Sequence, residues 1–315
     1  MTAKDISRET TNVILDPEVS SEIISKAIDE SAIMQLGTQM AMTGAGKKFQ
    51  TITGDPTPDW VDETDEKPIG YFTFGTKTVE PYKMALIVPV SMEFRRDKNA
   101  LYNECVNRLP KLFGRKIDQT VMSTSAPGQN FDVLGSCEKI SLIPAEGKTL
   151  YDQFLAVDAA IADADAVMNG IALAPKGRSI VLGAVDADKH PLFTAGVQSG
   201  TVDPILGAPV SVRKGVYVAG TAGSTADIVG LAGDFENLRY GIVQSITGSI
   251  TDQATINVGT AENPLQLNLW QRNMFAVRFE MEIALMVKDP NAFVLLTGNT
   301  PSATTTTTTT TTTGA

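Results

Sequence analysis

The residues of this chain that could support catalysis or ligand binding are few, and their spacing fits no familiar site. Residues 43–48 (TGAGKK) resemble the end of a phosphate-binding loop. That loop needs its first glycine where Ala41 stands, and it needs Ser or Thr for magnesium where Lys48 stands. His190 is the only histidine and precedes a proline in a polar loop, so a zinc site or a Ser-His-Asp triad has almost no residues to use. We expect a glycine turn at residues 43–48 and a surface position for His190.

A second candidate is the cluster of carboxylates in the acidic, proline-bracketed segment 60–68 (WVDETDEKP). Paired carboxylates can hydrolyse glycosides or bind a cation. Consecutive carboxylates in a loop are more often solvated, and these can also contact basic residues of another subunit. No glycine-rich dinucleotide fingerprint follows a strand. We therefore expect no catalytic residue, cofactor or metal, and the candidates for inter-subunit contact are Trp60, Asp62, Glu63, Asp65, Glu66, Lys67 and Lys77.

Composition limits the class of protein. The 315 residues suffice for two modest domains or one elaborated domain, with 43% hydrophobic and 20% charged residues. A net charge of −10 argues against a free-standing DNA-binding surface, although an acidic wall can enclose nucleic acid loosely. No apolar run approaches the ~18–20 residues that cross a bilayer, and the first residues lack a signal-peptide core. Cys105 and Cys137 have no paired spacing, and Cys105 lies on an apolar helical stripe, which predicts a buried thiol and synthesis in a reducing cytoplasm.

The strongest pattern is a long strand that leads directly into a long helix. From Tyr82 to Phe94 every even position is apolar, which predicts a strand with one buried face, and Pro81 and Pro89 place it at a sheet edge. Apolar residues then recur at helical spacing to Val121. Pro110 should kink this helix or end its first half. The hairpin before the helix has no core of its own, so it needs a partner surface, most simply another copy of the chain.

The other elements are weaker. A short helix should begin at Asp16, and a capping box at Thr149 should begin another that stops at residues 169–170. The long strand 275–287 would span roughly 40 Å. Ten consecutive threonines near the end predict a disordered tail. Further strands are expected at 47–53, 180–182, 208–212, 228–231 and 240–250, with one helical turn at 234–238.

Several motifs, taken in order, resemble the major capsid proteins of tailed bacteriophages and specifically the fold named after phage HK97. The resemblance extends over about residues 14 to 298. No single motif is unique, but their order is specific. The motifs are Trp60-Val61-Asp62-Glu63, Lys67-Pro68, Thr73-Phe74, Val88-Pro89-Val90-Ser91 with the long helix, Leu206-Gly207-Ala208-Pro209-Val210, Gly233-Asp234-Phe235 and Asp289-Pro290 with Ala292-Phe293.

The resemblance implies a mixed α/β (α+β) fold with four parts and a tail. These are an N-terminal arm (1–48), an extended β-hairpin loop (49–84), a peripheral domain with the spine helix and the long strand (85–135 and 250–288), an axial domain (136–249 and 289–300) and the threonine-rich tail (301–315).

The function that the resemblance implies is structural rather than enzymatic. The chain would self-assemble into pentamers and hexamers of an icosahedral phage head that encloses dsDNA without reading its sequence. It would be made in the cytoplasm of the bacterial host and become part of the virion, with a portal and decoration proteins as further partners. Some family members carry an N-terminal scaffold domain. Only about fifteen residues precede the first expected helix here, so we expect a separate scaffolding protein or scaffold-independent assembly.

Two alternatives stay open. One is an encapsulin-like compartment that holds protein cargo, and the other is an enzyme with unusual catalytic residues. Some capsid proteins are also joined by an isopeptide bond between a hairpin lysine and a peripheral-domain asparagine, assisted by a glutamate. Asn273 and Glu280 fall at the asparagine and glutamate positions, on the long strand, but Thr76 stands at the lysine position. Lys77 is one residue further along and should point to the opposite face, so we expect a shell held by non-covalent contacts.

Overall fold

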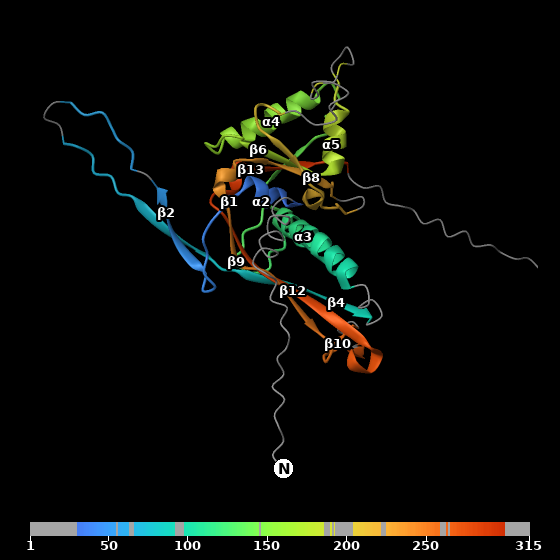
Figure 1. Cartoon of the computed structure of the whole chain (residues 1–315). Helices are drawn as coiled ribbons and strands as arrows, with labels where there is room; N and C mark the ends of the chain where they lie inside the picture. The colour runs from blue at the N-terminus through green and yellow to red at the C-terminus, as the bar shows by residue number, and fades with distance from the viewer. Residues whose placement is uncertain are drawn as a thin grey trace, which may run out of the picture.

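The computed structural model describes residues 30–54, 56–62, 66–91, 98–144, 146–185, 190, 192, 204–221, 225–258, 263 and 265–299. The helix expected from Asp16 and the threonine tail lie outside the described residues. Two sheets form the body, and a two-stranded hairpin projects from one side of it (Figure 1). No helix in the described part of the chain is long and apolar enough to cross a membrane.

The lower sheet is built around one long strand, β12 (Met274–Val287). Its strand order is β1–β9–β12–β4, with β1 at Thr38–Gln39, β9 at Leu238–Thr251 and β4 at Tyr82–Ser91. The strand β4 lies at the edge and pairs only with β12, as its prolines predicted. Pro89 lies opposite Ala276 in this pairing.

The two faces of β12 differ, as its alternation predicted. Arg278, Glu280 and Glu282 occupy one face, and apolar side chains occupy the other. The spine helix α3 (Lys98–Met122) contributes to the same core. This core joins Phe275, Val277, Phe279, Met281, Ile283 and Leu285 of β12 to Phe113, Ile117, Val121 and Met122 of α3.

The helix α3 continues past Pro110, so of the two expected outcomes the end of its first half is wrong, whereas the kink stays a prediction. A proline removes one backbone hydrogen bond, and this local loss does not outweigh the packing that follows it. Phe113 and Ile117 begin a buried stripe one turn later, and this stripe holds the second half of the helix on β12. The backbone at Cys105 belongs to this helix, but its side chain lies outside the described residues.

The upper sheet has the order β5–β13–β8–β6–β7. The helices α4 (Leu150–Ala162) and α5 (Pro175–Leu182) share a core with one face of this sheet, and α2 (Ala32–Leu36) and α3 share a core with the other. The strands are β5 (Glu138–Ser141), β13 (Phe293–Thr297), β8 (Ile228–Gly233), β6 (Gly170–Leu173) and β7 (Val210–Val212).

The capping box predicted at Thr149 is present. The Thr149 hydroxyl accepts from the Asp152 amide, and the Asp152 carboxylate accepts from the Thr149 amide at 2.7 Å. The expected stop of this helix at residues 169–170 is wrong, because α4 ends at Ala162 and Gly170 begins β6. Asp165, with a φ of 53°, turns the chain out of the helix.

Residues 180–182 are not a strand, which corrects the expectation for that segment. They form the last turn of α5, which begins with Pro175 at its first position. Gly177 allows this helix to approach β8, because a Cβ there would lie 2.5 Å from the Val229 carbonyl oxygen. The strand that does precede this helix is β6, which pairs with β8 and β7.

Two aspartates of the aligned motifs begin single helical turns between strands. Asp234 accepts from the Glu236 amide at the start of η3 (Phe235–Asn237), and Asp289 accepts from the Asn291 amide at the start of η5 (Pro290–Ala292). Two further turns are η2 (Lys214–Val216) and η4 (Trp270–Arg272). A small hairpin of β10 (Thr255–Asn257) and β11 (Gln266–Asn268) lies at the lower end of the molecule (Figure 1).

The packing of α4 predicts a contrast between two adjacent residues. Phe154 is fully buried, whereas Leu155 is 43% exposed. Phe154→Ala should lower the free energy of unfolding by about 3–5 kcal/mol, because it leaves a cavity in the core of the upper sheet. Leu155→Ala is the matched control and should change it by less than about 1 kcal/mol. Urea denaturation of the unassembled chain measures both, and equal losses would contradict this assignment of the core.

Candidate assembly interface

The projecting hairpin consists of β2 (Lys47–Gly54) and β3 (Thr73–Val79). These strands pair with one another, Phe49 opposite Lys77 and Ile52 opposite Phe74, and neither pairs with a third strand among the described residues. The turn before β2 is the expected glycine turn, in which Gly46 has a φ of 77° and its amide donates to the Thr43 carbonyl. The hairpin is therefore joined to the body only at its base, which includes Phe49, Lys77 and Val79 and which we call the foot.

The foot is anchored by an apolar cluster and an ion pair. Val79 is buried with Ala284 and Met286 of β12, and Phe49 packs against this cluster. The Lys77 Nζ atom lies 2.7 Å from Asp132 Oδ2 and donates to the Val287 carbonyl oxygen at 2.5 Å. These contacts set the direction in which the hairpin leaves the body.

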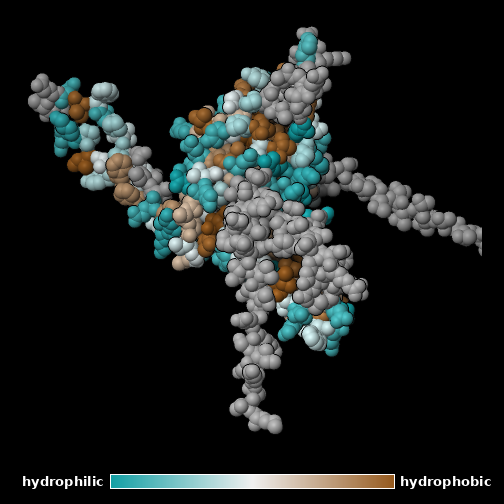
Figure 2. Space-filling view, in the orientation of Figure 1, coloured by the Kyte–Doolittle hydropathy of each residue, from teal (hydrophilic) through white to brown (hydrophobic). Residues whose placement is uncertain are grey.

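Beyond the foot, the hairpin exposes large apolar side chains. Trp60 is 100% exposed, and the aromatic residues between Tyr71 and Phe74 are each more than half exposed, at 79%, 53% and 72%. Figure 2 shows hydrophobic residues spread along this arm among hydrophilic ones. Isolated exposed apolar residues are ordinary, but a run of aromatic residues on an arm without a core marks an interaction surface. These side chains are Trp60, Val61, Ile69, Tyr71, Phe72 and Phe74.

The candidates predicted for inter-subunit contact divide into three groups. Trp60, Asp62, Glu66 and Lys67 lie exposed on the loop between β2 and β3. Glu63 and Asp65 lie outside the described residues. Lys77 lies at the foot, where its ammonium group contacts Asp132 of its own chain. The exposed aromatic residues Tyr71, Phe72 and Phe74 were not among the predicted contact residues, although an apolar run beside an acidic loop was visible at residues 69–74.

The positions compared with the isopeptide site lie far apart within one chain. Asn273 does not lie on the long strand as expected: it ends η4 with a φ of 51° and precedes β12. Glu280 lies on β12, six residues beyond Met274, which is roughly 20 Å along a strand. Its carboxylate lies 3.3 Å from Arg278 Nε and 3.8 Å from Lys83 Nζ.

Asp118 of α3 joins the start of α2 to the spine helix. Its carboxylate accepts from the Ser31 hydroxyl at 2.5 Å and from the amides of Ala32 and Ile33 at 3.0 and 3.3 Å. Ser31 caps the same helix by accepting from the Met34 amide. Burial raises the pKa of Asp118 to about 6, and the hydrogen bonds only partly offset this effect.

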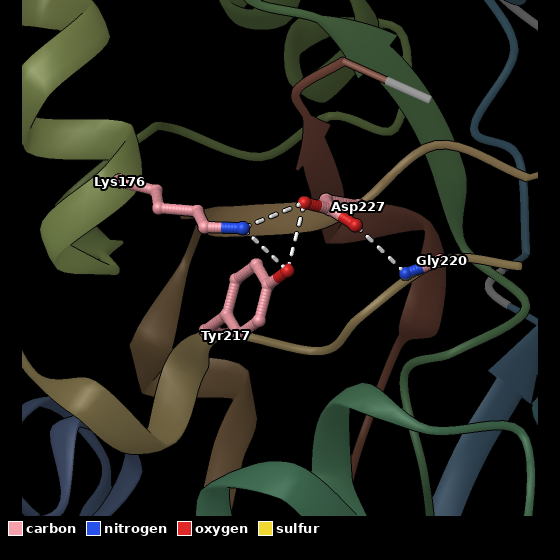
Figure 3. A network of polar contacts seen from close by, with 4 residues as sticks. All are labelled: Lys176, Tyr217, Gly220 and Asp227. Atoms are coloured by element: carbon pink, nitrogen blue, oxygen red, sulfur yellow. Dashed lines mark hydrogen bonds and ion pairs between the residues drawn. The ribbon is translucent and has the colours of Figure 1, made fainter. Parts of the chain in front are cut away.

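A second polar network closes a loop of the upper domain (Figure 3). Lys176 of α5 donates to the Tyr217 hydroxyl at 2.7 Å and to Asp227 Oδ2 at 3.1 Å, and Tyr217 donates to the same oxygen at 2.8 Å. Asp227 also accepts from the Gly220 amide at 2.9 Å.

The pKa shifts of Asp227 and Lys176 keep both side chains charged, which suits a structural ion pair better than a catalytic base or nucleophile. Burial alone would raise the pKa of Asp227, but the hydrogen bonds from Gly220, Tyr217 and Lys176 lower it. The hydrogen bond with Tyr217, followed by that with Asp227, raises the pKa of Lys176. The amine thus stays protonated and is a poor nucleophile or base at neutral pH. The network holds Tyr217 and Asp227 against Lys176 of α5.

The remaining groups with possible chemistry are dispersed. His190 is exposed, as expected. Burial, with a contribution from Asp289, raises the pKa of the Cys137 thiol to about 11, and its sulfur lies 3.2 Å from the Pro290 carbonyl oxygen. Across the described ranges, no group of three or more His, Cys, Asp or Glu residues is arranged to hold a metal ion.

The fold of this chain is also found in solved structures. Solved structures share the fold: a Microbacterium phage Oxtober96 protein superposes with a TM-score of 0.68 at 20% identity, covering 86% of this chain and 91% of that one. A capsid of a native GTA particle superposes with a TM-score of 0.57 at 14% identity, covering 96% of each chain.

Relatives found by sequence are major capsid proteins of phages. The probable major capsid protein gp17 of Mycobacterium phage L5 is 30% identical over 293 residues, which are 90% of this chain and 89% of that one. The major capsid protein of Staphylococcus phage 80alpha is 25% identical over 283 residues, covering 89% and 83%. Residues 11–298 match the model of the Phage capsid family, and the chain belongs to this family.

The buried carboxyl group of Asp118 predicts a pH dependence of stability. Because its pKa in the folded state is above the ordinary value of 3.8, the folded state binds the proton more tightly than the unfolded state. The contribution to stability is therefore full below pH 4, falls as the pH rises towards 6 and is lost above it. The two pKa units correspond to about 3 kcal/mol.

Asp118→Asn removes this titration. Between pH 4 and 7, the wild-type chain should lose about 3 kcal/mol of unfolding free energy relative to the variant. The variant also carries a constant penalty, because an amide has one acceptor oxygen where the carboxylate uses two. Urea denaturation at four pH values separates the two effects. Parallel pH profiles for the two chains would show that Asp118 does not titrate in this range.

Proposed function

We propose that this chain is the major structural protein of a phage head and assembles into rings of five and six copies that close an icosahedral shell. The observation that carries the proposal is the hairpin, whose aromatic residues are exposed and enter no core formed by the described residues. Two strands alone are marginal in water, so the stable position for this arm is against a neighbouring subunit. Membership of the Phage capsid family supports this role.

The rest of the proposal concerns what the shell contains and contacts. A net charge of −10 suits a wall that encloses dsDNA without binding its sequence, because repulsion keeps the polymer free of the wall. The mature protein is located in the virion, and assembly takes place in the bacterial cytoplasm. A separate scaffolding protein, a portal and decoration proteins are the further partners. The division into arm, extended loop, peripheral domain and axial domain belongs to the same proposal.

Shortening the hairpin tests the proposal directly. Replacing residues 55–72 with an Asn-Gly turn removes Trp60 and Tyr71 but keeps β2, β3 and the contact between Lys77 and Asp132. The variant should remain folded, with an unchanged thermal midpoint, and should fail to form shells in electron micrographs.

Normal shells from the shortened chain would refute the role of the hairpin. The contents of native wild-type particles add a second readout. Nucleic acid agrees with a phage head, whereas a protein cargo without nucleic acid would favour an encapsulin-like compartment.

The geometry at Lys77 predicts a shell without covalent links between subunits. Its ammonium group is engaged with Asp132 and the Val287 carbonyl of its own chain, and a protonated amine is a poor nucleophile. Mature particles boiled in detergent should give a single band near 33.6 kDa. A ladder of multimers, with a peptide linking Lys77 to Asn273 in the mass spectrum, would contradict this prediction.

A further inference from the structure

The helix α4 has two apolar stripes, and only one of them faces the core. Leu150, Phe154, Val157 and Ile161 are buried against the upper sheet. At 100° per residue, a second stripe lies about 125° around the helix. It begins with Tyr151 and Leu155, which are 44% and 43% exposed, and continues through the exposed residues Ala159 and Ala162. Hydrophobic residues reach the surface in Figure 2 over the region that α4 occupies in Figure 1.

Carboxylates border this exposed stripe. Asp158 lies on its core side, and Asp152 and Asp163 lie on its outer side, all three exposed. Asp152 serves the capping box, whereas Asp158 lies in the C-terminal half of the helix and Asp163 is its C-cap residue. The helix dipole is negative at that end and disfavours carboxylates there. The C-terminal half of α4 therefore presents an apolar strip flanked by negative charges. A surface that binds this strip should be apolar and should carry positive charges.

The opposite side of the same domain has cations. The sheet order places β5 and β7 at opposite edges, with α4 contacting β5 and β13 and α5 contacting β8 and β6. Arg213 and Lys214 follow β7 directly, and Lys214 is exposed. Leu206, 40% exposed, precedes the same strand. The ammonium group of Lys176 already contacts Asp227, so the cation that we assign to this surface is the exposed Lys214.

A closed ring requires each subunit to contact the next through two different surfaces that lie on opposite sides. In Figure 1 the hairpin leaves one side of the molecule, α4 runs across the top, and α5 lies on the side away from the hairpin. The strand β7 lies at the sheet edge opposite β5, the strand that α4 contacts. A ring contact that uses these two edges therefore brings α4 of one copy to the β7 edge of its neighbour.

We propose that the exposed stripe of α4, Tyr151, Leu155, Ala159 and Ala162, docks on the β7 edge of the next copy of this chain, with Asp158 and Asp163 facing Lys214. This inference rests on the proposed shell function. It assigns to α4 a role separate from the hairpin: the helix makes a second contact with the next copy.

The test uses the full chain and begins with the apolar stripe. Leu155→Lys should reduce the yield of rings and shells at least ten-fold, because it places a charged group in every contact of the ring. Leu155→Met keeps volume and apolarity and is the matched control, with wild-type yield expected. Native mass spectrometry counts the copies in each ring, and the thermal midpoint of the monomer verifies that each variant folds.

Charge reversal then identifies the partner surface. Asp158→Lys with Asp163→Lys should reduce the yield, as should Lys214→Glu alone. The chain carrying all three changes should recover it, since every contact in the ring is then reversed on both sides. Wild-type yield from the half-reversed chains would overturn the proposal, and so would a failure of the triple variant to recover.

Two further outcomes separate this inference from its alternatives. If the α4 variants form normal shells but lose a bound second protein, the stripe is a docking site for that protein and the proposed contact between copies is wrong. If the wild-type chain forms neither rings nor shells, the proposed shell function itself fails.

Discussion

Two strands alone cannot enclose a hydrophobic core. This constraint separates the body, which buries its large apolar side chains, from the hairpin, which leaves them exposed. In the body, β12 has a neighbour on each side and the spine helix over its apolar face, so its large side chains are covered within one chain. The hairpin has only its own two strands, and Trp60 and Tyr71 remain in water. Among the described residues nothing covers these two side chains, so the hydrophobic effect stabilises the hairpin only when a further surface covers them.

In the body and at the foot, polar contacts join elements that lie far apart in the sequence. Asp118 connects α2 to α3 across 86 and 87 residues, and Lys77 reaches the Val287 carbonyl across 210. Neither contact could nucleate folding alone, because each closes a long loop. They form once the apolar core has brought the elements together, and they then select one arrangement among several that would bury similar area.

The sequence predicted the long elements with one buried face and missed the short strand β6. Alternation located β4 and β12, the prolines placed β4 at an edge, and a capping box located the start of α4. The strand β6 is buried at every residue, so it has no alternation to detect. In α5, the run Ile180–Leu182 is too short to distinguish a strand from a helical turn, and the deciding contact of Gly177 with β8 is tertiary.

The candidate interface was predicted only in part, for a similar reason. The polarity of the loop directed attention to its charges, and the aromatic residues at 71–74 were not among the predicted contacts. Exposure depends on whether anything covers a side chain, and a single sequence does not carry that information for Phe74 or Tyr71. The same limit applied to Lys77, whose partner Asp132 comes from a loop after the spine helix.

The anchored foot gives the hairpin the mechanics of a lever rather than a tether. If the hairpin were attached by a flexible segment, a movement of its far end would bend that segment and would not reach the body. Here Val79 is packed against β12, and Lys77 holds the end of that strand, so a sideways load on the aromatic tip becomes a torque on the lower sheet. The stiffness of an assembly built from such arms would depend on a few buried contacts at the pivot as well as on the area of contact at the tip.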